Sequence, residues 1–148
     1  MLLRKSDLIS TESKELLNKF QNGFLDISIS DKIFYLPNGF DKTSINPIKN
    51  INEKENIMIT VGRIGSNQKN NEMMLNALEG LDLRDWKVYF IGPIEDSFHV
   101  KVKDFYTRSP KMRGKVVFLG NIDNKDKLYE WYNRSKVFFL TSQYEGFP

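Results

Sequence analysis

Short apolar runs alternate with longer amphipathic stretches from residue 57 onward. Ile57 to Val61 is a continuous run of apolar or β-branched residues, which is typical of a parallel strand buried on both faces. A glycine turn and a polar loop follow, and Lys69 then opens a stretch with apolar residues at helical spacing, at Met73, Met74, Ala77, Leu78 and Leu81. This pattern predicts a strand, a glycine turn and a helix laid on the sheet.

The same alternation continues to the end of the chain. Strands are predicted at residues 86–91, 115–119 and 137–141, with helices between them on apolar faces that include Phe105 and Trp131. Strands that alternate with helices predict an α/β fold, a Rossmann-like, doubly wound parallel sheet with right-handed crossovers. The aromatic residues near the end of this region are expected in the core: Trp131, Tyr132, Phe138 and Phe139.

Two shorter elements precede this region. Residues 10–13 have the composition of a helix N-cap, before a helix that ends near Gly23, and residues 32–36 form a β-rich run closed by Pro37, Asn38 and Gly39. The stretch that follows is polar and lacks periodicity, which indicates a loop or linker. We therefore divide the chain into three parts, residues 1–41, 42–56 and 57–148.

Composition narrows the classes of function. The 148 residues have a net charge of +3 and a pI of about 9.0. This mild excess of positive charge suits an anionic ligand but is too small to indicate nucleic acid. The absence of cysteine excludes disulfides, a thiol nucleophile and a zinc–thiolate site, and makes the cytoplasm the default compartment. The sequence has no apolar run long enough for a membrane span.

Two groups of residues have ordinary explanations that we favour. A basic run surrounds Pro110, and a solvated helix face explains it best, with contact to anionic lipid as the alternative. The run comprises Lys101, Lys103, Arg108, Lys111, Arg113 and Lys115. His99, the only histidine, is expected to be a surface or capping residue rather than a catalyst.

The candidate chemistry lies directly after the strands. A glycine-containing turn follows each predicted strand, and the predicted fold brings these four turns to one rim of the sheet. The turns are Gly62-Arg63, Gly92-Pro93, Gly120-Asn121 and Glu145-Gly146. Backbone N–H groups with the cations Arg63 and Lys69 suit a diphosphate, while a carboxylate can accept sugar hydroxyls. The alternative is that each glycine only makes a tight turn, since neither G-x-G-x-x-G nor a P-loop is present.

Taken together, these motifs resemble a known family. The segments VGRIGSNQKNNEMMLNAL, FIGP, VVFLGNI, LYEWYNRSKVFFLTS and YEGFP, preceded by IFYLPNGFD, are similar to the carboxyl-terminal domain of the retaining GT-B glycosyltransferases of family four, over roughly residues 33–148. In that family the nucleotide-sugar donor binds to this domain. The resemblance implies one half of a GT-B fold, truncated at its C-terminus. Residues 1–41 are then the tail of the amino-terminal domain and the interdomain crossing segment, and both ends of the chain look cut.

The resemblance also implies roles for individual residues. Arg63 and Lys69, with Gly62, match the positions that grip the donor diphosphate, and Glu145 matches the first acid of the E-x7-E pattern, near the donor sugar. The remaining matches are Asn121 and Ile122 at the nucleobase, and Gly146 and Phe147 as backbone N–H donors. Two departures are that Asn70 stands where glycine is common and that the second glutamate would fall beyond the last residue.

These residue types suit transfer chemistry. A leaving nucleoside diphosphate gains negative charge, which Arg63 and Lys69 can stabilise. The sequence has no D-x-D motif, so we expect neither a metal nor another cofactor. A positioning role for Glu145 is favoured over a covalent nucleophile, because retaining glycosidases need a close carboxylate pair and only one candidate is visible.

We therefore expect the donor-binding part of a hexosyltransferase-type enzyme that uses a UDP- or GDP-sugar. Its acceptor would be a glycan or lipid of the cell envelope, in polysaccharide biosynthesis, with retention of anomeric configuration. The expected location is cytoplasmic, with peripheral contact at the inner face of the membrane, and the chain alone is expected to be inactive. Two alternatives stay open, a non-catalytic nucleotide- or protein-binding module and a nucleotide-sugar epimerase of the same architecture.

Overall fold

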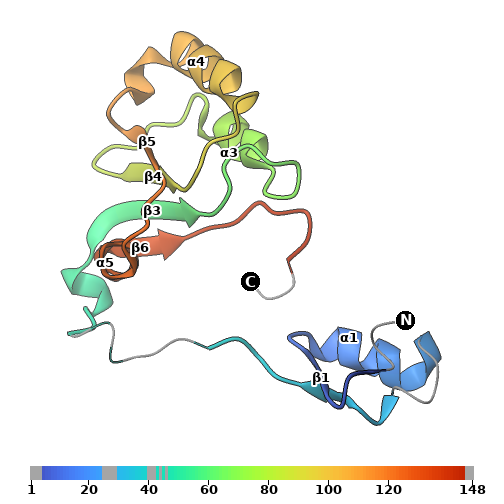
Figure 1. Ribbon diagram of the computed structural model, residues 1–148. Coiled ribbons are helices and arrows are strands. Elements are labelled where there is room, and N and C mark those ends of the chain that lie inside the picture. Colours follow the sequence, from blue (N-terminus) through green and yellow to red (C-terminus); the bar gives the residue numbers. More distant parts are fainter. Residues whose placement is uncertain (1–4, 25–29, 40–42, 44, 46, 146–148) are drawn as a thin grey trace. The chain divides into compact units, whose positions relative to one another are not determined.

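The computed structural model describes residues 5–24, 30–39, 43, 45 and 47–145. The chain divides into two compact units, one formed by Met1–Phe40 with Glu145–Pro148 and one by Asp41–Tyr144 (Figure 1). Each unit is described by itself below.

The smaller unit pairs two short parallel strands beside a helix. Its elements are β1 Ile9–Thr11, α1 Lys14–Lys19, the π-helical turn η2 Phe20–Phe24 and β2 Ile33–Tyr35. Ser13 caps α1, because its hydroxyl accepts from the Leu16 N–H at 3.3 Å, and Gly23 adopts a φ of +99° where the helical turn ends. The predicted helix is present, and β2 lies within the strand predicted at residues 32–36, whereas Ser10 and Thr11, expected within the cap, belong to β1.

The larger unit is built on a four-stranded parallel sheet in the order β5-β4-β3-β6 (Figure 1). Its elements are η4 Ile51–Glu53, β3 Glu55–Val61, α3 Asn71–Leu78, β4 Lys87–Ile91, α4 Phe98–Arg108, η5 Pro110–Met112, β5 Val116–Gly120, α5 Lys125–Arg134 and β6 Ser135–Phe138. The alternating pattern and parallel pairing agree with the predicted fold class. The main shift in boundaries is β6, which ends three residues before the predicted strand does.

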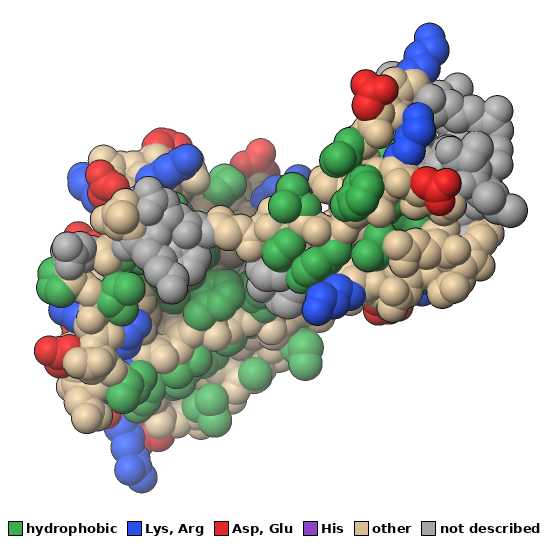
Figure 2. All heavy atoms as spheres, turned by 90° about the horizontal axis from the view of Figure 1, so that it is seen from below, with side chains coloured by type: hydrophobic (Ala, Val, Ile, Leu, Met, Phe, Trp, Pro, Cys, Tyr) green, Lys and Arg blue, Asp and Glu red, His purple; other side chains and the backbone are tan. Residues whose placement is uncertain are grey.

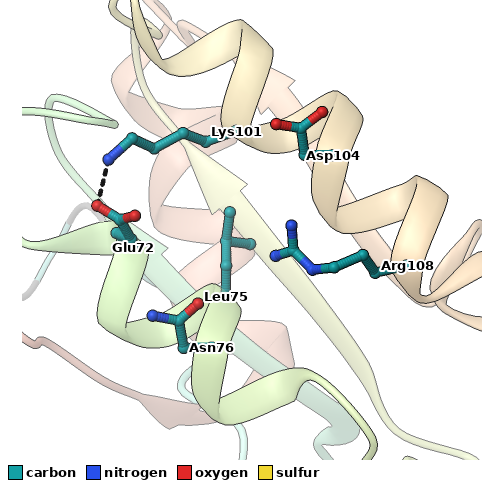
Figure 3. A pocket seen from close by; sticks show the side chains of 6 residues that line it. All are labelled: Glu72, Leu75, Asn76, Lys101, Asp104 and Arg108. Atoms are coloured by element: carbon teal, nitrogen blue, oxygen red, sulfur yellow. Dashed lines mark hydrogen bonds and ion pairs between the residues drawn. The ribbon is translucent and has the colours of Figure 1, made fainter.

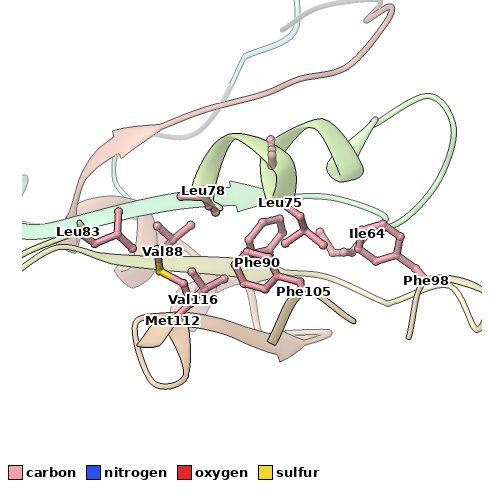
Figure 4. Close-up of a cluster of buried hydrophobic side chains, with 11 residues drawn as sticks. Ile64, Leu75, Leu78, Leu83, Val88, Phe90, Phe98, Phe105, Met112 and Val116 are labelled. Carbon is pink, nitrogen blue, oxygen red and sulfur yellow. The ribbon is translucent and has the colours of Figure 1, made fainter. Parts of the chain in front are cut away.

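Side chains on the central strands point alternately to the two faces of the sheet. On β4, Val88 and Phe90 join the larger apolar cluster with α3 and α4, while Tyr89 and Ile91 pack on the side of α5. Figure 4 shows the first cluster, in which Phe90 lies beside Leu75 of α3 and Phe105 of α4. A strand that is buried on both faces in this way needs a continuous apolar run, which explains why the sequence pattern located it.

The buried stripe of α3 differs from the predicted one. Met74, Leu75 and Leu78 are buried, whereas Met73 is 58% exposed and Leu81 lies beyond the end of the helix. Apolar residues occupy more than one side of this helix, so their spacing in the sequence does not decide which side is buried. The helix also begins at Asn71 rather than Lys69, because Asn70 adopts the left-handed conformation with φ +47°.

The opposite face of the sheet has less cover, since within residues 47–145 α5 is the helix that packs there. Trp131 and Tyr132 are half-buried against Ile57, Ile59 and Ile91, as expected of core residues. Phe138 is 45% exposed, so its expected place in the core is wrong. Figure 2, seen from below, shows hydrophobic side chains gathered on this side of the larger unit.

Residues 47–56, within the stretch expected to be a linker, are part of the larger unit and are bonded to α5. The Asn133 side chain accepts from the Lys49 N–H at 2.8 Å and donates to the Pro47 carbonyl at 2.9 Å. Glu55 opens β3 and pairs with Arg134 at 2.6 Å, a hydrogen bond that lowers the pKa of the Glu55 carboxyl. This segment is therefore tied to α5.

The closest backbone approach at the strand ends yields a stability prediction. Gly92 has a φ of +137°, and a Cβ there would lie 1.8 Å from the Gly62 carbonyl oxygen. Gly92→Ala is therefore expected to lower the free energy of unfolding by roughly 3 kcal/mol or more, from strain and overlap together. Chemical denaturation would measure this loss.

Gly80→Ala is the matched control. Gly80 has a φ of +83° with no atom within 4 Å of a built Cβ, so only backbone strain of about 1 to 2 kcal/mol is expected. Equal losses in the two variants would show that the contact with Gly62 does not constrain the fold.

Candidate functional site

The strand order places a topological switch point at β3. The chain begins this sheet in its interior, moves outward through β4 to β5, and returns through α5 to β6 on the other side of β3. The loops after β3 and β6 therefore leave the sheet side by side, while α3, which follows β3, and α5, which precedes β6, lie on different faces. In open α/β sheets ligands bind in the crevice at this position, beyond the carboxyl ends of the strands.

The loop after β3 carries two cations next to a glycine backbone. Gly62 has a φ of +150°, and a Cβ there would lie 3.2 Å from Lys69 Cε and 3.7 Å from Lys69 Nζ. The half-buried Lys69 side chain thus runs over the Gly62 backbone, and a Cβ at Gly62 would make a tight contact with it. Arg63, the next residue, is exposed. The two predicted cations therefore belong to one short loop at the end of β3.

Hydrogen bonds within this loop fix its path. The Ser66 carbonyl accepts from the Asn70 N–H at 3.1 Å, and the Ser66 hydroxyl donates to the Arg63 carbonyl at 3.3 Å. Asn71, only 2% exposed, accepts the Gly65 N–H at 2.8 Å through its side-chain oxygen. A buried amide oxygen that closes a turn in this way replaces the water that the backbone would otherwise need.

The segment after β6 runs alongside this loop and is bonded to it. The Thr141 hydroxyl lies 3.0 Å from the Lys69 carbonyl oxygen and 2.9 Å from that of Asn70. Next along the segment, the Gln143 N–H donates to the Gln68 carbonyl at 2.9 Å, and the Gln68 side chain donates to the Tyr144 carbonyl at 3.2 Å. The two sides of the switch point therefore form one hydrogen-bonded surface.

A small apolar hollow of about 100 Å³ opens on the same rim. It is lined by Val61, Gly62, Ile91, Gly92, Pro93, Asn121, Ile122 and Leu128. The Gly62 N–H donates to the Ile91 carbonyl at 2.9 Å and the Gly92 N–H to the Gly120 carbonyl at 2.8 Å, which links three strand ends in a row. Three of the four predicted glycine turns thus meet at this rim, and Asn121 is oriented by a hydrogen bond to Asp123.

A second, polar hollow of about 440 Å³ lies beside the loop after β3. Arg63 shares it with Glu95 and Ser97 from the loop after β4, with Tyr144, and with Gly65, Ser66, Asn67 and Gln68. The Glu95 N–H donates to the Ile64 carbonyl at 2.9 Å, so the loops after β3 and β4 are tied together beneath it. Hydroxyl, amide and charged groups of both signs suit a polar ligand with both acceptors and donors.

A third hollow lies away from the strand ends, between α3 and α4 (Figure 3). Figure 3 shows Leu75 between Lys101 and Arg108, with Glu72 of α3 paired to Lys101 of α4. Arg108 in turn pairs with Glu79 at 2.9 Å, which raises the pKa of its guanidinium. These charges already neutralise one another across the helix interface, so we assign this groove to packing of α3 against α4.

The structure describes most of the predicted site residues. Gly62, Arg63 and Lys69 share one loop, and Asn121 and Ile122 line the apolar hollow. Glu145 follows directly after Tyr144 in the chain but groups with the smaller unit. Gly146 and Phe147 lie outside the described residues. His99 is exposed on the first turn of α4, as expected of a surface residue.

Sequence reasoning did not select Thr141, Gln68 or Asn71. Threonine, glutamine and asparagine are ordinary loop residues, and Thr141 was expected to end a strand. Among the residues that the structure describes, no group of three or more His, Asp or Glu side chains gathers as metal ligands. Within the same residues no helix is both long and apolar enough to cross a membrane.

Comparison with solved structures identifies the architecture. The chain is similar to the lipopolysaccharide outer core galactosyltransferase WaaB in its apo form, with a TM-score of 0.66 and 20% identity over 97% of this chain and 39% of that one. It is similar to Anabaena Alr3699/HepE in complex with UDP-glucose, with a TM-score of 0.67 and 16% identity over 95% and 40% of the two chains. The third is the sucrose-phosphate synthase of Thermosynechococcus elongatus, with a TM-score of 0.70 and 17% identity over 99% and 38%.

The sequence shares the GT-B, Rossmann-like half-domain fold with these structures and spans about two fifths of their length. No curated protein sequence matches it. The family described as glycosyl transferases group 1 matches residues 41–148, which is the whole of the larger unit and the end of the chain. The chain therefore belongs to the glycosyl transferases group 1 family.

Proposed function

We propose that the larger unit is the donor-binding domain of a glycosyltransferase that takes a sugar from a nucleotide-sugar with retention of configuration. The observation that carries this proposal is the loop after β3, in which Lys69 lies over Gly62 and Arg63 is exposed at the switch point of the sheet. Two cations beside backbone with no side chain suit a diphosphate, which needs both charge and close approach.

The proposed chemistry follows from the charge that develops on the leaving group. As the bond between the sugar and the diphosphate breaks, negative charge grows on the phosphate oxygens. Arg63 and Lys69 would stabilise that charge more strongly than the charge of the bound donor, which is the condition for faster transfer. Because the sequence has no D-x-D motif, the proposal includes no metal ion and no other cofactor.

The apolar hollow is the proposed nucleobase site. Ile122, Val61 and Leu128 give it apolar walls, while Asn121 stands at its edge as a polar group. A flat base buries its faces against such walls and bonds through its edge. Both UDP and GDP fit the proposal, and UDP is favoured because the similar Anabaena structure holds UDP-glucose.

Glu145 is proposed to position the donor sugar, and the acceptor is proposed to be a glycan or lipid of the cell envelope. Because the chain spans about two fifths of the similar structures, we expect it to bind donor without transferring sugar. The alternatives give different products: a non-catalytic module leaves a bound UDP-sugar unchanged even in a longer chain with acceptor, whereas an epimerase interconverts it with its epimer.

Loss of either cation should weaken nucleotide binding. Arg63→Ala and Lys69→Ala are each expected to reduce the affinity for UDP by about 1.5 to 3 kcal/mol, the size of a hydrogen bond to a charged group. Calorimetric titration with UDP and GDP would measure this and identify the preferred base. The effect should shrink as salt concentration rises, because screening weakens the attraction.

Lys103→Ala is the control for a lost positive charge, since Lys103 is exposed on α4 and lines neither rim hollow. It should leave UDP affinity unchanged. A folded chain that binds no nucleotide, or equal losses in all three variants, would contradict the proposed donor site.

The two parts of the site should be separable. Ile122→Ala removes apolar contact to the base, so UDP affinity should fall by about 1 kcal/mol while pyrophosphate affinity stays the same. Arg63→Ala should weaken both ligands. Competition calorimetry with UDP and pyrophosphate would test this. Val100→Ala, at an exposed position of α4, is the control. Parallel losses for both ligands in Ile122→Ala would argue against a nucleobase at this hollow.

Peripheral contact with an anionic membrane is the last part of the proposal. Lys103 and Lys111 are exposed on α4 and η5, and among the described residues neither has an ion pair. Co-sedimentation with phosphatidylglycerol vesicles should decrease in a Lys103→Glu and Lys111→Glu double variant. The matched control changes Lys125 and Lys127 of α5 to glutamate. Equal losses of vesicle binding in the two double variants would show that binding depends on the net charge of the chain and not on Lys103 and Lys111.

A further inference from the structure

We propose that Thr141 is a positioning residue that holds Lys69 in place for the diphosphate. Its hydroxyl lies within hydrogen-bond distance of two successive carbonyls, at 3.0 Å from Lys69 and 2.9 Å from Asn70. One hydroxyl proton shared between two acceptors is a bifurcated hydrogen bond. The inference rests on the proposed function and adds to it a residue that the cation motif does not contain.

The two carbonyls belong to the peptide groups on either side of the Asn70 Cα. Asn70 has φ +47° and ψ +43°, a left-handed conformation that costs free energy for a residue with a Cβ. Asparagine tolerates it better than most residues do, but the neighbouring structure must still hold it. The Thr141 hydroxyl bonds both peptide groups and so fixes this turn from outside the loop.

The turn at Asn70 determines the direction of the Lys69 side chain. Lys69 is the last residue before the turn, and its chain runs over Gly62, with Nζ 3.7 Å from the position of a Cβ there. Beyond the turn, Asn71 is buried and begins α3, so the far side of the turn is anchored. The peptide group before Lys69 is held by the Gln143 N–H at the Gln68 carbonyl, and the one after it by the Thr141 hydroxyl. With both held, the Lys69 Cα–Cβ bond keeps one direction, which aims the side chain over the glycine backbone.

Other contacts from the same segment act on the residue before Lys69. The Gln143 N–H donates to the Gln68 carbonyl at 2.9 Å, and the Gln68 side chain donates to the Tyr144 carbonyl. Thr141 is the member of this segment whose side chain makes the contact, so it can be changed without altering the backbone hydrogen bonds. Thr141→Val keeps the shape of the side chain and removes the hydroxyl.

Loss of the Thr141 hydroxyl is expected to lower the affinity for UDP although Thr141 itself does not contact the ligand. Without the hydroxyl, the turn at Asn70 can adopt more than one conformation. The Lys69 side chain must then be ordered when the diphosphate binds. Such ordering lowers affinity without removing a contact. We expect UDP to bind roughly 5- to 20-fold more weakly to Thr141→Val, while Thr141→Ser, which keeps the hydroxyl, stays within about twofold of the wild type.

A double-mutant cycle tests the assignment. UDP would be titrated into wild type, Thr141→Val, Lys69→Ala and the double variant, with thermal unfolding recorded for each. If Thr141 acts through Lys69, Thr141→Val causes no further loss once Lys69 is alanine. The salt dependence of UDP binding should also become shallower in Thr141→Val, as in Lys69→Ala, because the contribution of one cation is reduced.

Three results would decide against the inference. Full UDP affinity in Thr141→Val would overturn it, and so would the same fold-loss in the Lys69→Ala background, since Thr141 would then act by another route. Thr141→Ala serves as the second variant if Thr141→Val does not fold, with the same expected cycle. Wild-type chain that is folded and binds no nucleotide would refute the proposed function, and the inference with it.

Discussion

The pairing of β3 with a neighbour on each side is the interaction on which the rest of this unit depends. β3 hydrogen-bonds to β4 along one edge and to β6 along the other, all three strands running parallel. Because β4 follows β3 in the chain and β6 comes last, the helices that connect these strands lie on opposite faces. Among the residues that the structure describes, no crossover helix covers the loops beyond β3 and β6, and the polar groups of these loops gather at one crevice.

Close approach at that crevice is possible because a glycine directly follows each of two strands, β3 and β4. The Gly92 backbone lies against the Gly62 carbonyl, and the Lys69 side chain covers the other side of Gly62. A side chain at Gly62 would compete with Lys69, and one at Gly92 would separate the ends of β3 and β4. The same two positions therefore serve both the packing of the sheet and the surface offered to a ligand.

The fold could be predicted from sequence to the extent that burial leaves a one-dimensional pattern. Strands such as 57–61 and 87–91 are buried on both faces and need uninterrupted apolar runs, which are visible in any single sequence. The predicted stripe of α3 is right at Met74 and Leu78 but wrong at Met73, which is apolar yet exposed. Phe138 was assigned to the core, although in the described part of the chain α5 is the one helix on its side of the sheet. Exposure of this kind depends on how many elements cover a face, which periodicity does not encode.

The candidate site likewise contains residues that the sequence identified and residues that only the structure revealed. Arg63 and Lys69 were identified because charge after a glycine turn has a chemical meaning by itself, whereas Thr141 acquires its role only by meeting a carbonyl 72 residues earlier in the chain. The structure also separates the two cations, which the sequence treated as equals. Lys69 is half-buried and directly precedes the left-handed turn at Asn70, while Arg63 is exposed. Charge interactions are stronger where water is excluded, so in the proposed donor site the half-buried lysine should set the position of a diphosphate and the exposed arginine should close on it afterwards.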